Sequence, residues 1–219
     1  MDSIQSSLSS LEKAVAENPN DSELLLKLAS LYVKSDSLKN AVSALEKSLE
    51  LNASLYAARY LLACAYSRGN AFAYAFREFQ KIVDEDGDFC FDRIDFSSLP
   101  DCSSASKAWE SYGFSEGNSP DRLFSAGFAL FAMNEKEKSL GFFKRCMSLN
   151  PKYGSVNFFA ALVAYDMEDY SSAWNYFQQD ASVRPQSAST LYYLGMVCMK
   201  RGNFKQALPF FQKAISIKN

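Results

Sequence analysis

The chain has 219 residues, of which 48% are hydrophobic and 22% are charged, and its net charge is −2. This composition is typical of a globular protein with a sizeable core, and without a basic stripe it does not indicate a nucleic-acid-binding surface. The chain contains no histidine, which removes the commonest general base and the commonest neutral metal ligand. We therefore expect a protein that is not an enzyme, with no catalytic residues, no metal and no cofactor.

The sequence gives no indication of export or of membrane insertion. Residues 1–5 contain no basic segment followed by an apolar core, so a signal peptide is not expected. No apolar run is long enough to cross a bilayer. The five cysteines are scattered and include no C-x-x-C pair, which a reducing compartment explains most simply. The sequence therefore predicts a cytoplasmic protein.

Small and large apolar residues recur in the first part of the chain with a period of about 34 residues. Two units share the pattern: Leu25-x-x-Leu28-Ala29-x-x-Tyr32 with Ala41-x-x-x-Leu45, and Arg59-x-x-Leu62-Ala63-x-x-Tyr66 with Ala75-x-x-x-Phe79. Residues three and four positions apart share one face of a helix, so each unit is predicted to be a helix pair whose small residues let two backbones approach. Ser7-x-x-x-Leu11 and Pro19 predict one earlier helix.

The segment 88–118 interrupts the period. Ala75 and Ser139 occupy equivalent positions, but the distance between them along the chain falls four positions short of two periods. This segment must absorb the difference, and we interpret it as a degenerate repeat. A loop insertion is the alternative, because serine, proline, glycine and asparagine are frequent in it.

Part of the degenerate repeat still matches the pattern. Ala105 and Trp109 lie one period before a small and an aromatic residue of the next unit, which predicts a second helix at residues 103–112. Residues 88–100 are too short and too irregular for a normal first helix.

An acidic cluster lies at the start of this segment. Asp84-x-Asp86-x-Asp88 resembles the beginning of a calcium-binding loop, but Phe89 replaces the required glycine and Asp95 stands at the twelfth position in place of glutamate. We therefore expect a solvated turn rather than a metal site.

The C-terminal part begins with an apolar helix. Residues 123–133 are apolar at every position except Ser125, and such a helix must be covered on all sides. The preceding Ser119-Pro120-Asp121 provides an N-cap residue, a proline at the first helical position and an early acid. The second-helix pattern then continues with Ser139-x-x-x-Phe143, Ala173-x-x-x-Phe177 and Ala207-x-x-x-Phe211. Pro209 is expected to bend the last helix or to loosen its start.

These spacings resemble the tetratricopeptide repeat, in which W-x-x-L-G-x-x-Y precedes A-x-x-x-F and a proline within about 34 residues. The resemblance covers about residues 4–87 and 119–219, although no unit has the leading tryptophan. It implies an all-α fold, a right-handed α-solenoid of antiparallel helix pairs with one degenerate repeat in the middle. The expected organisation is an N-terminal block at 1–87 with one lone helix and two repeats, a degenerate repeat or insertion at 88–118, and a C-terminal block of three repeats at 119–219.

The resemblance also implies that the first helices line a concave groove, with the positions outside the small-residue pattern facing it. In the C-terminal block these positions are apolar and form three columns that step by one period. They predict a peptide-binding groove lined by Phe124, Phe128, Phe131, Phe158, Leu162, Tyr165, Tyr192, Met196 and Met199. Without Lys, Arg or Asn at these positions, a clamp for a peptide carboxylate is disfavoured, and an apolar or amphipathic peptide is expected.

The alternative interpretation is that the chain fills this groove itself. Residues 88–118 would then fold across the apolar helix and place there Phe89, Phe91, Ile94, Phe96 and Trp109. In that case the protein is expected to be a structural scaffold that assembles through its repeat ends.

The last predicted helix offers an apolar face that is a candidate assembly face, formed by Phe204, Leu208, Phe211 and Ile215. No polar capping helix follows it in the sequence. We therefore expect either that the protein continues in a longer parent or that this face pairs with another subunit. The expected partners are another protein or peptide segment and, where this face pairs, a second copy of the chain in a homo-oligomer.

Overall fold

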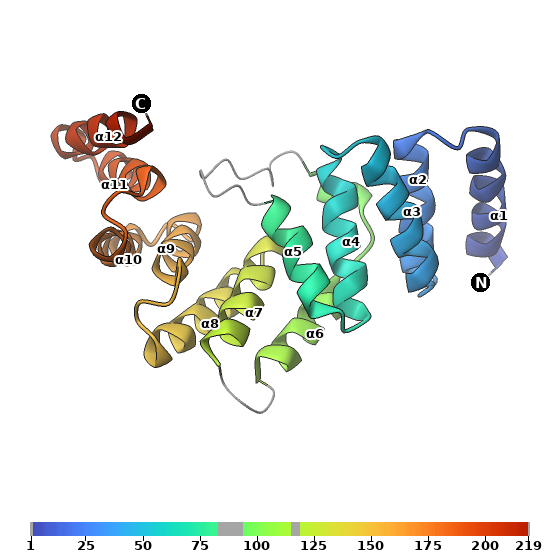
Figure 1. Ribbon diagram of the computed structural model, residues 1–219, viewed down its shortest axis with the longest axis horizontal. Helices are drawn as coiled ribbons and strands as arrows, with labels where there is room; N and C mark the ends of the chain where they lie inside the picture. The colour runs from blue at the N-terminus through green and yellow to red at the C-terminus, as the bar shows by residue number, and fades with distance from the viewer. Residues whose placement is uncertain (1, 83–93, 115–118, 219) are drawn as a thin grey trace. The chain divides into compact units, whose positions relative to one another are not determined.

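A computed structural model describes residues 2–82, 94–114 and 119–218, and Figure 1 shows its helices in chain order. Within these ranges all regular secondary structure is helical, so the predicted all-α fold is confirmed. The described residues form two compact units, one extending to Trp109 and the other beginning at Glu110. The division falls inside α6 (Ser103–Phe114).

The N-terminal unit consists of consecutive helices that each pack on the next. They are α1 (Asp2–Glu17), α2 (Ser22–Lys34), α3 (Leu38–Leu51), α4 (Tyr56–Arg68) and α5 (Phe72–Ile82). The small residues of the repeat pattern are completely buried, namely Ala29, Ala41, Ala63 and Ala75. The helices therefore meet at the positions that the repeat period singles out.

The described part of the middle segment contains a three-residue 3-10 helix (Phe96–Ser98) and then α6. Trp109 on α6 is completely buried. Its indole Nε1–H donates a hydrogen bond to Ser67 Oγ at 2.7 Å, and its ring lies 4.9 Å from that of Phe72. The predicted helix at residues 103–112 is thus present, and Trp109 anchors it in the N-terminal unit. The calcium-like motif at 84–88 lies outside the described residues.

The C-terminal unit contains three helix pairs joined by short turns. They are α7 (Pro120–Ala132) with α8 (Lys136–Leu149), α9 (Val156–Asp166) with α10 (Tyr170–Val183), and α11 (Ala188–Lys200) with α12 (Phe204–Lys218). Ser119 caps α7 as predicted, because its Oγ accepts a hydrogen bond from the Arg122 amide at 3.3 Å. Asp169 likewise caps α10 through the Ser172 amide at 3.0 Å. Helix α12 continues through Pro209 to Lys218.

The turn inside each described helix pair contains one residue in the left-handed region. These residues are Asp36, Asn70, Asn134, Glu168 and Gly202, with φ between 58° and 75°. The amide that follows donates to a carbonyl near the end of the first helix, for example Asn203 N–H to Cys198 O at 2.8 Å. This arrangement closes the first helix. Asn70 and Asn134 are separated by the same number of positions as Ala75 and Ser139. The turns in the structure are therefore also four positions short of two repeat periods.

Two first helices of the C-terminal unit carry a glycine against which an aromatic ring packs. A Cβ atom added to Gly127 would lie 2.8 Å from Phe143 Cδ1, and one added to Gly195 would lie 2.5 Å from Phe211 Cε1. Carbon atoms do not approach this closely, so each position requires glycine. The space freed by these two glycines is therefore occupied by the ring of the second helix rather than by its backbone.

Replacing Gly195 by alanine should destabilise the C-terminal unit by about 1–3 kcal/mol, because the Phe211 ring has to move away from the new methyl group. Gly141→Ala is the matched control, since nothing lies within 4 Å of a Cβ at this helical position. That change should stabilise the chain by up to about 1 kcal/mol through helix propensity. Urea denaturation of both variants measures the two effects, and equal stabilities would contradict the packing described here.

Candidate functional site

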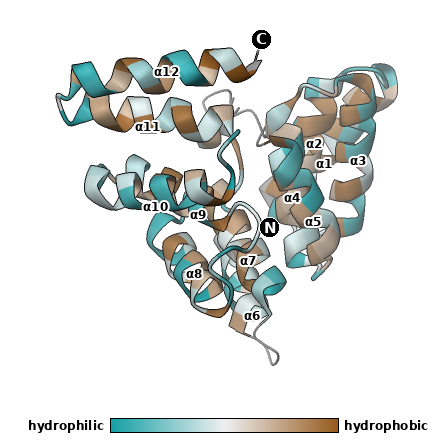
Figure 2. Ribbon diagram, turned by 60° about the vertical axis from the view of Figure 1, so that its left-hand side comes forward, coloured by the Kyte–Doolittle hydropathy of each residue, from teal (hydrophilic) through white to brown (hydrophobic). Residues whose placement is uncertain are grey.

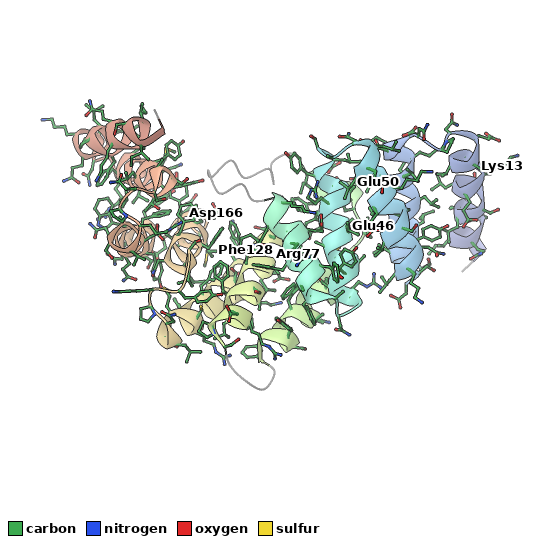
Figure 3. The ribbon with its side chains drawn as sticks, in the orientation of Figure 1. Lys13, Glu46, Glu50, Arg77, Phe128 and Asp166 are labelled. Atoms are coloured by element: carbon green, nitrogen blue, oxygen red, sulfur yellow. The ribbon has the colours of Figure 1, made fainter. Side chains whose placement is uncertain are left out.

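The predicted groove residues lie on α7, α9 and α11, the first helices of the three C-terminal repeats. Within each helix their spacing of four and three residues places them on one face. They differ greatly in exposure. Phe128, Phe131, Phe158 and Leu162 are buried; Phe124, Tyr165 and Met196 are half-buried; Tyr192 and Met199 are exposed. Phe128 is labelled in Figure 3.

The ring of Phe159 on α9 explains the burial of aromatic residues on α7. Its centroid lies 4.9 Å from that of Phe128, 5.9 Å from Phe124 and 6.0 Å from Phe131. The contact with Phe128 is edge-to-face, which aromatic pairs favour. The groove face of one repeat is therefore partly covered by a side chain of the next repeat.

Tyr193 on α11 has the same role one repeat later. Its ring lies 6.0 Å from Phe158 and 5.8 Å from Tyr165, and it stacks on Phe177 at 5.4 Å. Burial raises the pKa of the Tyr165 hydroxyl above its ordinary value. Phe159 and Tyr193 are one repeat period apart, so the repeat spacing could have indicated both residues. The predicted columns instead contain their sequence neighbours Phe158 and Tyr192.

A cationic group adjoins the aromatic face. The Arg184 guanidinium carbon lies 5.4 Å from the centroid of the Phe158 ring. One edge of the guanidinium also donates two hydrogen bonds to the buried Asp180, from Nε to Oδ1 at 3.0 Å and from Nη2 to Oδ2 at 2.8 Å. Thr190 donates its hydroxyl to the same carboxylate. Arg184 is therefore engaged within the unit, and it does not offer a free clamp for a peptide carboxylate.

The exposed part of the predicted groove belongs to the last repeat. Tyr192 is 47% exposed and Met199 is 42% exposed on α11, with the half-buried Met196 between them. Tyr192 also contacts Phe211 of α12 with a centroid distance of 5.7 Å. This surface, Tyr192, Met196 and Met199, is called the α11 face below. It offers an aromatic ring and two flexible thioethers without a formal charge.

Phe96 and Trp109, the described aromatic residues that the alternative interpretation places in the groove, pack elsewhere. Phe96 lies 5.1 Å from Tyr60 on α4, and Trp109 contacts α4 and α5. Both contacts are inside the N-terminal unit. Ile94 is buried. Phe89 and Phe91 lie outside the described residues.

The described cysteines include one pair in contact. The thiols of Cys64 on α4 and Cys102 share a hydrogen bond, which lowers the pKa of Cys102, while burial raises the pKa of Cys64. Cys64, Cys146 and Cys198 are buried, and Cys102 is half-buried. Cys90 lies outside the described residues. Across residues 2–82, 94–114 and 119–218, no group of His, Cys, Asp and Glu is placed to hold a metal ion.

None of the helices in the described ranges combines the length and the apolar character needed to cross a bilayer.

Comparison with known proteins identifies two repeats. Residues 22–55 and 188–218 match models of the tetratricopeptide repeat, and they correspond to α2 with α3 and to α11 with α12. The predicted resemblance to the tetratricopeptide repeat is thereby confirmed for these two segments. No curated protein sequence matches the chain.

Several solved structures are similar to the chain. One is YrrB, a TPR protein with an unusual peptide-binding site, with 21% identity, coverage of 94% of this chain and 91% of that chain, and a TM-score of 0.47. A structure of MamA shows 17% identity, coverage of 85% and 92%, and a TM-score of 0.47. A double mutant of MamA shows 13% identity, coverage of 90% and 94%, and a TM-score of 0.48.

Replacing Phe158 by alanine should cost about 3–5 kcal/mol of stability, because it leaves a cavity among packed rings. Replacing Tyr192 by alanine should cost less than about 1 kcal/mol, because its ring is half in solvent. Thermal and urea unfolding distinguish the two variants. If Tyr192→Ala proves as damaging as Phe158→Ala, the division of this face into core and surface is wrong.

Proposed function

We propose that this chain, which contains tetratricopeptide repeats, is a non-catalytic adaptor that binds another protein. The bound segment is an apolar or amphipathic peptide, and it lies along the groove face of the C-terminal repeats. The peptide contacts the exposed side chains of the α11 face. It also contacts the half-buried Tyr165 on α9 and Phe124 on α7. The buried aromatic rings beneath these residues support them and do not contact the peptide.

The observation that carries this proposal is the exposure of Tyr192 and Met199 on the same repeat positions that are buried or half-buried upstream. Tyrosine and methionine are enriched in protein interfaces because they combine a large contact area with few polar demands. None of the nine groove residues is charged, so binding buries no unpaired charge on this side. A peptide with apolar anchors is the ligand that fits such a surface.

The second candidate function is a structural scaffold that assembles through its repeat ends. The exposure of Phe204, Leu208 and Ile215 on α12 supports it. The contacts of Phe96 and Trp109 with α4 and α5 weaken the associated idea that the middle segment fills the groove. Analytical ultracentrifugation separates the candidates, since the adaptor is expected to be monomeric and the scaffold to associate as concentration rises.

The adaptor proposal predicts that Tyr192→Ser combined with Met199→Ser weakens peptide binding by at least about tenfold, because two interface anchors are lost. Suitable ligands are peptides selected from a random library on the unmodified chain, and fluorescence anisotropy measures their affinity. Both residues are substantially exposed, so the circular dichroism spectrum and the melting temperature should change little.

The matched control is Leu149→Ser, which removes an apolar side chain that is 52% exposed on α8, outside the proposed groove. It should leave the affinity unchanged. Selected peptides that bind the Tyr192→Ser, Met199→Ser variant as tightly as the unmodified chain would exclude the α11 face as the site.

A further inference from the structure

Helix α12 carries an exposed apolar stripe. Phe204 is 64% exposed, Leu208 58% and Ile215 62%. With Phe211, these residues follow the spacing of four, three and four that defines one helix face. The stripe is about 16 Å long at 1.5 Å per residue, or three helical turns. Phe211 sits at its edge and turns toward Gly195 on α11. Figure 2 shows α11 and α12 side by side.

The equivalent face of the preceding repeat is partly covered. Trp174, which lies one repeat period before Leu208, is half-buried on α10. Its ring contacts that of Phe210 at 5.8 Å, so a helix of the following repeat packs on it. The α12 stripe therefore has the position and spacing of a face that receives another helix.

The charged side chains of the last repeat have one sign. No aspartate or glutamate follows Asp180 in the sequence, whereas six basic residues do: Arg184, Lys200, Arg201, Lys205, Lys213 and Lys218. Since the whole chain has a net charge of −2, this end is basic and the remainder is acidic. Lys200, Arg201, Lys205 and Lys213 are exposed. In the part of the chain that the structure describes, none of these four forms a salt bridge.

We propose that the α12 stripe is a docking site for an amphipathic helix of another protein, whose apolar residues are flanked by aspartate or glutamate. The apolar residues of the partner would cover Phe204, Leu208 and Ile215, as a following repeat covers Trp174. Its carboxylates would lie near Lys200, Arg201 and Lys205. This site is distinct from the α11 face and does not depend on it.

Charge also distinguishes this partner from a second copy of the chain. A symmetric dimer through α12 would bring together two surfaces that are both basic and whose side chains include no carboxylate. Like charges facing each other oppose association. An acidic helix would instead place its carboxylates near Lys200, Arg201 and Lys205, where opposite charges attract.

The probes are helical peptides of about 18 residues with fluorescein at one end and Leu, Ile or Phe at the apolar positions of an i, i+4, i+7, i+11 pattern. Each peptide has glutamate next to its apolar positions, and each is paired with a control peptide that has lysine at the same positions. Fluorescence anisotropy with the full chain should show at least one glutamate peptide binding about tenfold or more tightly than its lysine counterpart, with an affinity that falls as salt rises.

Two sets of variants locate the site. Phe204→Ser with Leu208→Ser should weaken glutamate-peptide binding by at least about tenfold. Lys200→Glu with Lys205→Glu should weaken it and reverse the preference between the two peptide types. Leu149→Ser and Lys47→Glu are matched controls, because they alter an exposed apolar and an exposed basic residue elsewhere; they should have no effect.

Each other outcome overturns the proposal. If no glutamate peptide is preferred over its lysine counterpart, or if Phe204→Ser with Leu208→Ser changes nothing, the stripe does not recognise an acidic helix. Sedimentation that shows a dimer lost in the same variant would identify a second copy as the occupant. Flotation with phosphatidylserine vesicles, lost in that variant while no peptide binds, would identify a lipid surface.

Discussion

The structure of this chain depends on a contact between a small residue on one helix and a large side chain on the next. In the C-terminal unit the rings of Phe143 and Phe211 lie where a Cβ of Gly127 or Gly195 would be. In the N-terminal unit Ala29 and Ala63 are completely buried at the equivalent positions. Each such contact fixes one helix pair, and a pair exposes an apolar face that only another helix can cover. The repeat period follows from this requirement.

Much of the fold could be predicted from the sequence because the residues that make this contact recur at a fixed spacing along the chain. The helix pairs, the cap at Ser119 and the helix around Trp109 all follow from local patterns. The shortfall of four positions between the two registers reappears between the turn residues Asn70 and Asn134. These features depend on spacing along the chain, which a single sequence contains in full.

The lining of the candidate site could be predicted only in part. Spacing shows that Phe124, Phe128 and Phe131 share a face, but it does not show which side chain of the next repeat lies over them. Phe159 and Tyr193 supply those side chains, and they adjoin the columns that periodicity selects. An apolar column is thus core where a described repeat packs on it, whereas several apolar side chains of α11 and α12 are exposed in the described part of the chain. Accessibility is set by the position of a repeat in the stack, and residue type alone does not reveal it.

The central claim is that, among the nine groove residues and the α12 stripe, the apolar side chains most exposed to a partner lie on α11 and α12. Carbene footprinting of the full chain with mass-spectrometric detection tests it directly, because the label modifies apolar side chains that reach solvent. The account predicts strong labelling of Tyr192, Met199, Phe204, Leu208 and Ile215, and protection of Phe128, Phe158 and Leu162. Strong labelling of the latter three, with protection of the stripe on α12, would contradict it.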